Sequence, residues 1–123
     1  MSAKRIRKHL IELIGFLTEL IRSSEATSQM LFIVQHTHSE SNCPARDPEQ
    51  GNMLLQHINQ NAAHFGVTIN AEGVANGKHQ FHLIVESDSQ ENVERFMTPF
   101  KQAGQVEILP ASPCEVVVDR GAC

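Results

Sequence analysis

The sequence of 123 residues predicts an α+β domain with the element order strand–helix–strand–strand–helix–strand, and three features lead to this prediction. Alternating apolar residues at 67–71 and 81–85 indicate strands. Apolar residues spaced three and four apart, at 54–65 and 93–100, indicate helices. The pair Asn-Gly at 76–77 is the strongest short signal for a hairpin, so it joins two of the strands.

The first strand and the first helix precede these elements. The apolar run 31–34 begins a strand that continues to His36. Asp47 favours a helix start because its carboxylate can accept hydrogen bonds from the first backbone amides, and Pro48 suits the first helical position. Gly66 is expected to end this helix.

The second helix and the last strand follow the hairpin. Asp88 is expected to cap the helix, Pro99 to distort its last turn and Gly104 to end it. A fourth strand is predicted at 106–109. The valine-rich segment 114–118 could add a short fifth strand.

This element order is that of the ferredoxin-like fold, and its antiparallel sheet is predicted to be apolar on both faces. On the first strand, Leu31 and Ile33 lie on one face, while Phe32 and Val34 lie on the other. Ile84 on the third strand lies opposite the main apolar face of that strand. Because such a sheet needs a second cover, we expect a homodimer that packs sheet against sheet.

Two short segments resemble a known superfamily. They are His36-Thr37-His38 followed by Cys43-Pro44, and Leu-Pro-Ala-Ser-Pro-Cys-Glu at 109–115. Residues 30–118 resemble the dimeric α+β barrel superfamily, and within it a group of short bacterial proteins without an assigned activity. The resemblance implies a cavity between sheet and helices that could take a small molecule. Relatives include nickel-binding proteins, muconolactone-type isomerases, small cofactor-free monooxygenases and haem-handling enzymes, so the resemblance does not select a chemistry.

Composition excludes some classes of function. Hydrophobic residues make up 41% and charged residues 20%, as in a globular protein. The net charge of −4 and the absence of Trp and Tyr argue against nucleic acid as a partner. No apolar run approaches the roughly 20 residues needed to span a bilayer. No secretory signal is recognised, so a cytoplasmic protein is expected.

The N-terminal part differs from the rest of the chain. Residues 1–29 carry five basic and three acidic residues, whereas residues 30–123 carry five basic and eleven acidic ones. The segment 4–22 is predicted to form an amphipathic helix, followed by a polar linker, before the α+β domain at 30–123. The helix could pack on its own domain or on a twin copy, lie on a membrane surface, or dock a partner. The linker ends at Met30, so the segment could also be an extension that the working protein lacks.

The candidate site is a metal centre. His36 and His38, two apart at a strand end, lie on one sheet face, and Cys43 follows in a loop. Two imidazoles and a thiolate suit zinc, copper, nickel or iron. Because three cysteines are an odd count, free thiols or metal ligands are favoured over disulfides. Cys114 could complete the set, and Asp47 or Glu49 could supply an oxygen ligand.

Metal-free alternatives stay open for the same residues. His36 or His38 could be the general base of a small cofactor-free isomerase or monooxygenase acting in the cavity. Cys43 could be a nucleophile activated by one of these imidazoles. The three side chains could also be ordinary loop residues. Dependence on Cys43 separates metal binding from proton transfer by a histidine.

The remaining histidines carry weaker expectations. His57 and His64 are expected on the exposed flank of the first helix. His82 could reach the same cavity face as a residue of the first strand. His79, beside the Asn-Gly pair, is interpreted as a turn residue. The terminal Cys123 is expected to be exposed.

Overall fold

The computed structural model describes residues 29–123, so the predicted helix at 4–22 lies outside the described residues. The regular elements are β1 (Met30–Thr37), α2 (Pro48–Gln56), β2 (Val67–Ala75), β3 (Gln80–Ser87), α3 (Gln90–Phe96), α4 (Thr98–Lys101), β4 (Gln105–Ala111) and α5 (Cys114–Arg120). The first seven follow the predicted βαββαβ order, with the second helix divided into α3 and α4.

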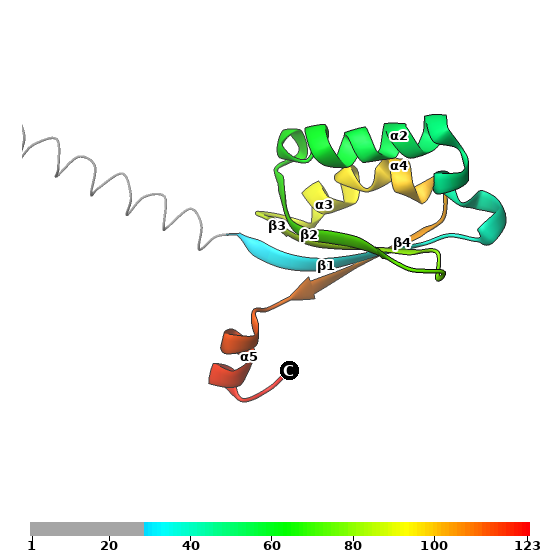
Figure 1. Ribbon diagram of the computed structural model, residues 1–123. Coiled ribbons are helices and arrows are strands. Elements are labelled where there is room, and N and C mark those ends of the chain that lie inside the picture. Colours follow the sequence, from blue (N-terminus) through cyan, green and yellow to red (C-terminus); the bar gives the residue numbers. More distant parts are fainter. Residues whose placement is uncertain (1–28) are drawn as a thin grey trace, which may run out of the picture.

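The four strands form one antiparallel sheet in the order β2-β3-β1-β4. This is the strand order that the predicted element order implies. Helices α2, α3 and α4 cover one face of the sheet, and α5 lies on the opposite side (Figure 1). The central strand β1 pairs with both β3 and β4, so it holds the middle of the domain together.

The core lies between the sheet and the helices. β1 contributes Phe32 and Val34, and β3 contributes Leu83 and Val85, all at most 1% exposed. The predicted apolar stripe of the second helix faces them and consists of buried Val93, Phe96, Met97 and Phe100. Full burial of an aliphatic or aromatic side chain contributes about 1.5–3 kcal/mol, so this stripe anchors α3 and α4 to the sheet.

The other sheet face carries an apolar row, and none of the helices α2, α3 and α4 lies on this side (Figure 1). Ile33 on β1 pairs with Ile84 on β3 and with Leu109 on β4, and Ile84 pairs with Ala71 on β2. We call these four residues the apolar row. Ile33, Ile84 and Leu109 are 40–48% exposed, so the sheet presents apolar side chains on both faces, as predicted.

Local capping groups fix the helix starts. The Asp47 carboxylate accepts hydrogen bonds from the backbone amides of Glu49 and Gln50, which confirms the predicted cap of α2. The cap of α3 is Ser89 and not Asp88, because the Ser89 hydroxyl accepts the Asn92 amide. The Asp88 carboxylate instead accepts a hydrogen bond from the Asn92 side chain.

The first helix is not uniform along its length. After α2 the chain continues as a π-helical segment, η3 (His57–Asn61), and a 3-10 turn, η4 (Ala63–Phe65). Gly66 ends it with a φ of 73°, the left-handed conformation that favours glycine. His57 is three residues after buried Leu54 and therefore lies on the same helix face, towards the core.

The predicted fifth strand at 114–118 is wrong, because these residues form the helix α5. A strand there would need a neighbour for its backbone groups. β4 is an edge strand, and the chain leaves its line after Ala111 through Ser112-Pro113. A helix satisfies its backbone hydrogen bonds within the segment, and this outweighs the strand preference of the valines.

Gly104 allows β1 and the turn before β4 to approach closely. A Cβ at this position would contact the Thr37 carbonyl oxygen and would lie 2.9 Å from His36 Nε2. Both contacts are closer than side-chain carbons normally allow, and one involves backbone. The conformation at the end of β1, which carries His36, therefore depends on residue 104 being glycine.

We expect Gly104→Ala to destabilise the protein by about 1–3 kcal/mol, because the added methyl group must displace backbone. Gly73→Ala is the matched control, since a Cβ at Gly73 meets no atom within 4 Å. It should be neutral or stabilising by at most about 1 kcal/mol. Urea denaturation of both variants measures the difference. Equal midpoints for the two variants would contradict the close approach.

Among residues 29–123, no helix has the length and apolar character that a membrane crossing requires.

Candidate metal centre

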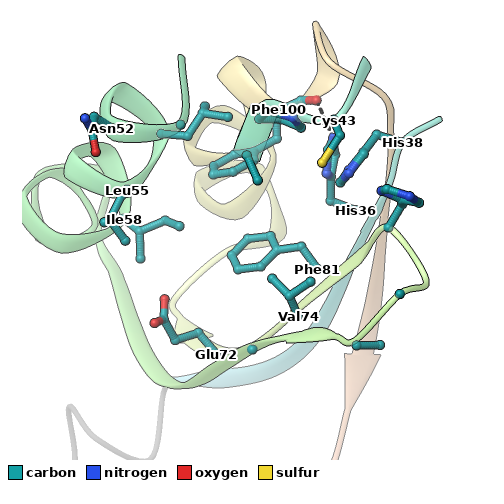
Figure 2. Close-up of a pocket in the computed structure, with 18 residues that line it drawn as sticks. His36, His38, Cys43, Asn52, Leu55, Ile58, Glu72, Val74, Phe81 and Phe100 are labelled. Atoms are coloured by element: carbon teal, nitrogen blue, oxygen red, sulfur yellow. Dashed lines mark hydrogen bonds between the residues drawn. The ribbon is translucent and has the colours of Figure 1, made fainter. Parts of the chain in front are cut away.

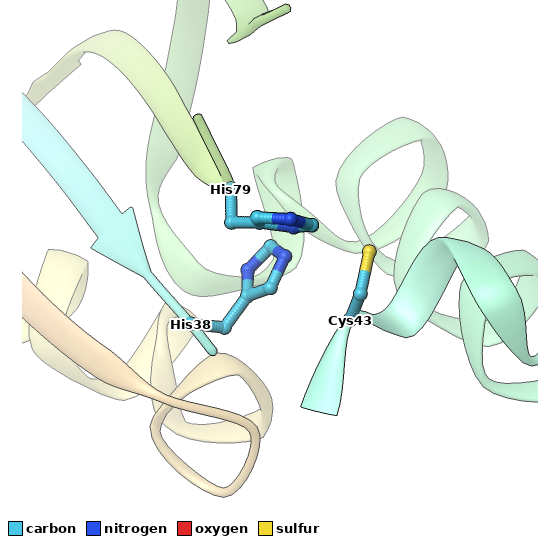
Figure 3. Close-up of side chains that lie close together, drawn as sticks. All are labelled: His38, Cys43 and His79. Atoms are coloured by element: carbon cyan, nitrogen blue, oxygen red, sulfur yellow. The ribbon is translucent and has the colours of Figure 1, made fainter. Parts of the chain in front are cut away.

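Three side chains from different parts of the chain meet at one end of the sheet (Figure 3). His38 directly follows β1, Cys43 lies between η1 (Glu40–Asn42) and η2 (Pro44–Arg46), and His79 lies in the turn between β2 and β3. Ligand atoms of His38, Cys43 and His79 lie within 4.8 Å of one another. We call these three residues the triad.

The hairpin turn brings His79 to His38. β2 and β3 close at Ala75 and Gln80, so the turn has four residues, with Gly77 and His79 both at positive φ. The His38 backbone amide donates a hydrogen bond to the His79 carbonyl, with an N···O distance of 3.2 Å. The two ring centroids are 5.2 Å apart as a consequence.

Two short turns hold Cys43 at the third corner. The Ser39 hydroxyl accepts the Asn42 amide and caps η1. On the other side of Cys43, the Pro44 carbonyl oxygen would lie 3.0 Å from a Cβ on Gly51, so η2 sits directly against α2. Gly51 thus lets the Cys43 loop pack against the first turn of α2.

The imidazole of His38 has no hydrogen-bond partner in the described part of the chain. Both ring nitrogens are buried, and neither forms a hydrogen bond with residues 29–123. A buried polar atom without a partner costs about 1–3 kcal/mol, and a neutral imidazole has both a donor and an acceptor to satisfy. Such an atom needs an explanation, and a ligand bound to the ring supplies one.

His36 is engaged elsewhere and stands behind the triad. Its side chain is 2% exposed, and its Nε2 donates to the Phe100 carbonyl oxygen at 2.8 Å. A carbonyl can only accept, so the proton is on Nε2. The ring lies 5.3 Å from that of His38, centroid to centroid. His36 therefore packs beside His38 in a fixed orientation, and its hydrogen bond links β1 to α4.

Burial lowers the pKa of both histidines on this strand end. For His36, loss of hydration lowers the pKa, and the hydrogen bond to Phe100 opposes this in part. For His38, loss of hydration is again the largest cause of the lowered pKa, followed by repulsion from His36 and from His79. Both rings are therefore neutral at pH 7, which is the state that binds metal ions.

The structure does not bring Cys114 to the triad within one chain. Cys114 begins α5, just beyond the end of β4 at Ala111, and Ala111 pairs with Leu31 at the start of β1. His38 follows the opposite end of β1, roughly 20 Å along the strand. Cys114 and Cys123 are exposed, whereas Cys43 is half-buried.

The other polar candidates have separate places. His57 is buried, which contradicts the exposed flank expected for it. Its Nε2 donates to the Phe96 carbonyl at 2.7 Å, and its Nδ1 accepts from the Asn61 side chain. His82 lies on the uncovered sheet face opposite Gln35, away from the triad. Asp47 caps α2 and is not part of the triad.

The triad lies at one end of a cavity of about 680 Å³ between α2 and the β2–β3 hairpin (Figure 2). Most of its lining is apolar and includes Leu54, Leu55, Ile58, Val74, Phe81 and Phe100. Its size is in the range of small-molecule sites. A metal centre and an organic ligand could therefore share one space.

The region that forms this site coincides with a known sequence family. A family described as "Domain of unknown function (DUF3303)" matches residues 30–122. The chain belongs to the DUF3303 family. Neither the curated proteins nor the solved structures contain a match to it. The description of the DUF3303 family assigns no activity.

Interpretation of the sequence missed His79 as a site residue of the DUF3303 domain. The signal was present in the predicted topology. An antiparallel pairing of the first and third strands places the residue before the third strand beside the residues that follow the first. Thr37 indeed pairs with Gln80, which leaves His38 and His79 as neighbours.

We expect the free energy of unfolding of the metal-free DUF3303 domain to fall as the pH drops from about 8 to about 5. The folded-state pKa values of His36 and His38 are lowered, so the unfolded chain, with pKa near 6.5, binds protons first. Their contribution is fully present above pH 6.5 and is lost as the pH falls through the lowered folded-state values.

Urea titrations in the presence of a chelator measure this pH dependence. The double variant His36→Gln, His38→Gln removes both ionisations, and glutamine at 36 can still donate to Phe100. It should show a shallower loss of stability over the same range. A loss as steep as that of the wild type would contradict the assignment.

Proposed function

We propose that this protein binds one transition-metal ion through His38, Cys43 and His79. The observation that carries the proposal is that their ligand atoms lie within 4.8 Å of one another, one of them on an imidazole without a hydrogen-bond partner among residues 29–123. Ligand atoms in a tetrahedral site with bonds of about 2.0–2.3 Å lie roughly 3.5 Å apart. Small side-chain rotations would close the triad to that spacing.

The chemistry of the three donor atoms limits which metal ions can bind. Two imidazoles and one thiolate favour zinc, copper(I), nickel and iron(II) over calcium and magnesium, which prefer oxygen ligands. Three protein ligands leave one tetrahedral position open, and an open position is typical of catalytic and sensing sites. The triad adjoins the cavity, so the open position would be accessible to a small molecule.

His36 has a supporting role in this proposal. Its Nε2 is bound to the Phe100 carbonyl, so the ring is held rigidly beside His38. Groups behind the ligands of a metal commonly orient them and contribute to affinity. The proposed ligand set thus keeps His38 and Cys43 from the sequence-based set, takes His79 from the hairpin, and places His36 behind them.

We expect cobalt(II), used as a spectroscopic substitute for zinc, to give thiolate-to-metal charge-transfer absorption with the wild type. His38→Ala, His79→Ala and Cys43→Ser should each weaken binding at least tenfold, because each removes one of three ligands. Cys43→Ser should also abolish the charge-transfer band. Competition with a chromophoric chelator measures the affinities.

Two matched variants control for the loss of a histidine or a cysteine as such. His82→Ala changes a histidine on the other sheet face, and Cys114→Ser changes an exposed cysteine at the far end of β4. Both should bind cobalt like the wild type. Equal binding by all five variants, or no binding by the wild type below about 10 µM, would refute the metal site.

A metal-free function is the second candidate, favoured by the neutral, unpartnered His38 ring at the cavity. Such an imidazole could act as the general base of a small isomerase or cofactor-free monooxygenase. In that case Cys43→Ser would leave the activity intact, whereas His38→Gln would remove it. A metal-dependent function requires both residues.

We also propose that two copies pack through their uncovered sheet faces. The apolar row supports this, because each of the four strands places one apolar side chain in a row across the middle of the uncovered face. α5 lies on the same side of the sheet, has no buried residue and exposes Val118 to 76% (Figure 1). Helices of this length are unstable alone in water, so α5 needs a surface to pack on.

The area of the sheet face indicates that both the sheet and α5 would contribute to the proposed dimer interface. Strands about 4.8 Å apart, each with about seven residues of 3.3 Å, give a sheet face of roughly 450 Å². Two such faces fall short of the roughly 1,600 Å² of a standard stable interface. In the proposed dimer the two α5 helices supply the remaining contact area against the partner sheet.

We expect Ile33→Glu to shift the full-length protein towards the monomer, by at least tenfold in the dissociation constant. A charge at the centre of the apolar row would be buried without a partner. Asn59→Glu is the control. Asn59 is exposed on η3, on the helix side of the domain, and its substitution should not change the oligomeric state. Sedimentation equilibrium decides, and a wild type that is monomeric at 50 µM would exclude the dimer.

A further inference from the structure

The cavity beside the triad has two exposed apolar walls that face each other. Leu55 on α2 is 51% exposed and Val74 on β2 is 61% exposed, and both line the cavity. Ile58 continues the helical wall, and Phe81 lies beside Val74 on the sheet wall (Figure 2). Large apolar side chains left open inside a concave site indicate a ligand with an apolar body.

A carboxylate stands at the end of the cavity away from the triad. Glu72 lines the cavity and lies across it from Cys43 and His38 (Figure 2). It is three residues before the last residue of β2, Ala75, so it lies roughly 10 Å along the strand from the hairpin turn that carries His79. The two polar ends of the cavity are thus about two aromatic rings apart.

An irregularity in β2 places Glu72 there. Ile69 pairs with Val85, but Ala71 pairs with Ile84, so the register shifts by one residue between them. Without this bulge, the side chains of Glu72 and Val74 would point to the uncovered face of the sheet. With it, they pair with the inward-facing Leu83 and Phe81. Bulges commonly redirect a side chain next to a functional site.

We infer that the cavity binds an elongated apolar monocarboxylate, whose carboxylate occupies the open position of the metal and whose far end is neutral or cationic. This inference rests on the proposed metal site. The metal ion attracts an anionic oxygen ligand, the apolar walls cover the body of the molecule, and Glu72 repels a second anion at the far end.

Three probes that differ at one position test the inference. Biphenyl-4-carboxylate has an apolar body of the required length, and its 4′-aminomethyl and 4′-carboxylate derivatives add a cation or an anion at the far end. The chain contains no Trp and no Tyr, so the fluorescence of the biphenyl group can be read without background from these residues. Anisotropy titrations with the zinc-loaded full chain give the dissociation constants.

We expect biphenyl-4-carboxylate to bind the zinc-loaded protein at least tenfold more tightly than the metal-free protein. The aminomethyl derivative should bind roughly threefold more tightly than the parent, and the dicarboxylate roughly threefold more weakly, as for a partly exposed charge pair. Glu72→Gln should remove this ranking without changing zinc affinity. Leu55→Asp, on the exposed wall, should weaken all three probes and leave zinc binding intact.

The outcomes separate this inference from the proposed function. If zinc binds with one equivalent per chain but the probes bind equally with and without it, the ligand inference is wrong and the metal site stands. A ranking that survives Glu72→Gln would overturn the assigned role of Glu72. If no zinc binds, both proposals fall.

Discussion

The position of β1 between two antiparallel neighbours is the constraint on which the rest of this structure depends. Its pairing with β3 and β4 turns Phe32, Val34 and His36 towards the helices and Ile33 towards the uncovered face. The same pairing places the end of β1 beside the start of β3. The core, the uncovered apolar row and the triad all follow from this one alignment, because a shift by one residue would exchange the two faces.

The end of β1 is held by polar contacts that the apolar core could not supply. His36 donates a hydrogen bond to Phe100, and Gly104 lets the chain between α4 and β4 approach within contact distance of Thr37. These contacts fix the direction in which the chain leaves the strand, and therefore where His38 lies. The side chain of His38 has no such partner among residues 29–123. The end of β1 thus presents one neutral imidazole whose two buried nitrogens lack a hydrogen-bond partner, and such a ring can bind a ligand.

The proposed metal site and the proposed dimer interface lie on opposite faces of the sheet. The triad and the cavity lie on the helix side, between α2 and the β2–β3 hairpin. The apolar row lies on the other side, where α5 also lies. A substitution on one face therefore leaves the groups of the other in place, and metal binding and dimerisation can be tested independently. The bulge in β2 is the exception, because it decides which residues of one edge strand face the cavity.

The sequence by itself determined the βαββαβ order, the cap at Asp47, the left-handed Gly66 and the buried stripe of the second helix. These features depend on spacing and on local hydrogen bonds, which a sequence contains directly. Tertiary structure decided what depended on residues far apart in the chain. His79 joined the triad because β3 pairs with β1, and Glu72 faced the cavity because a bulge changed the register. The segment 114–118 became helical because the chain turns out of the line of β4 after Ala111, and the valine preference alone could not reveal that.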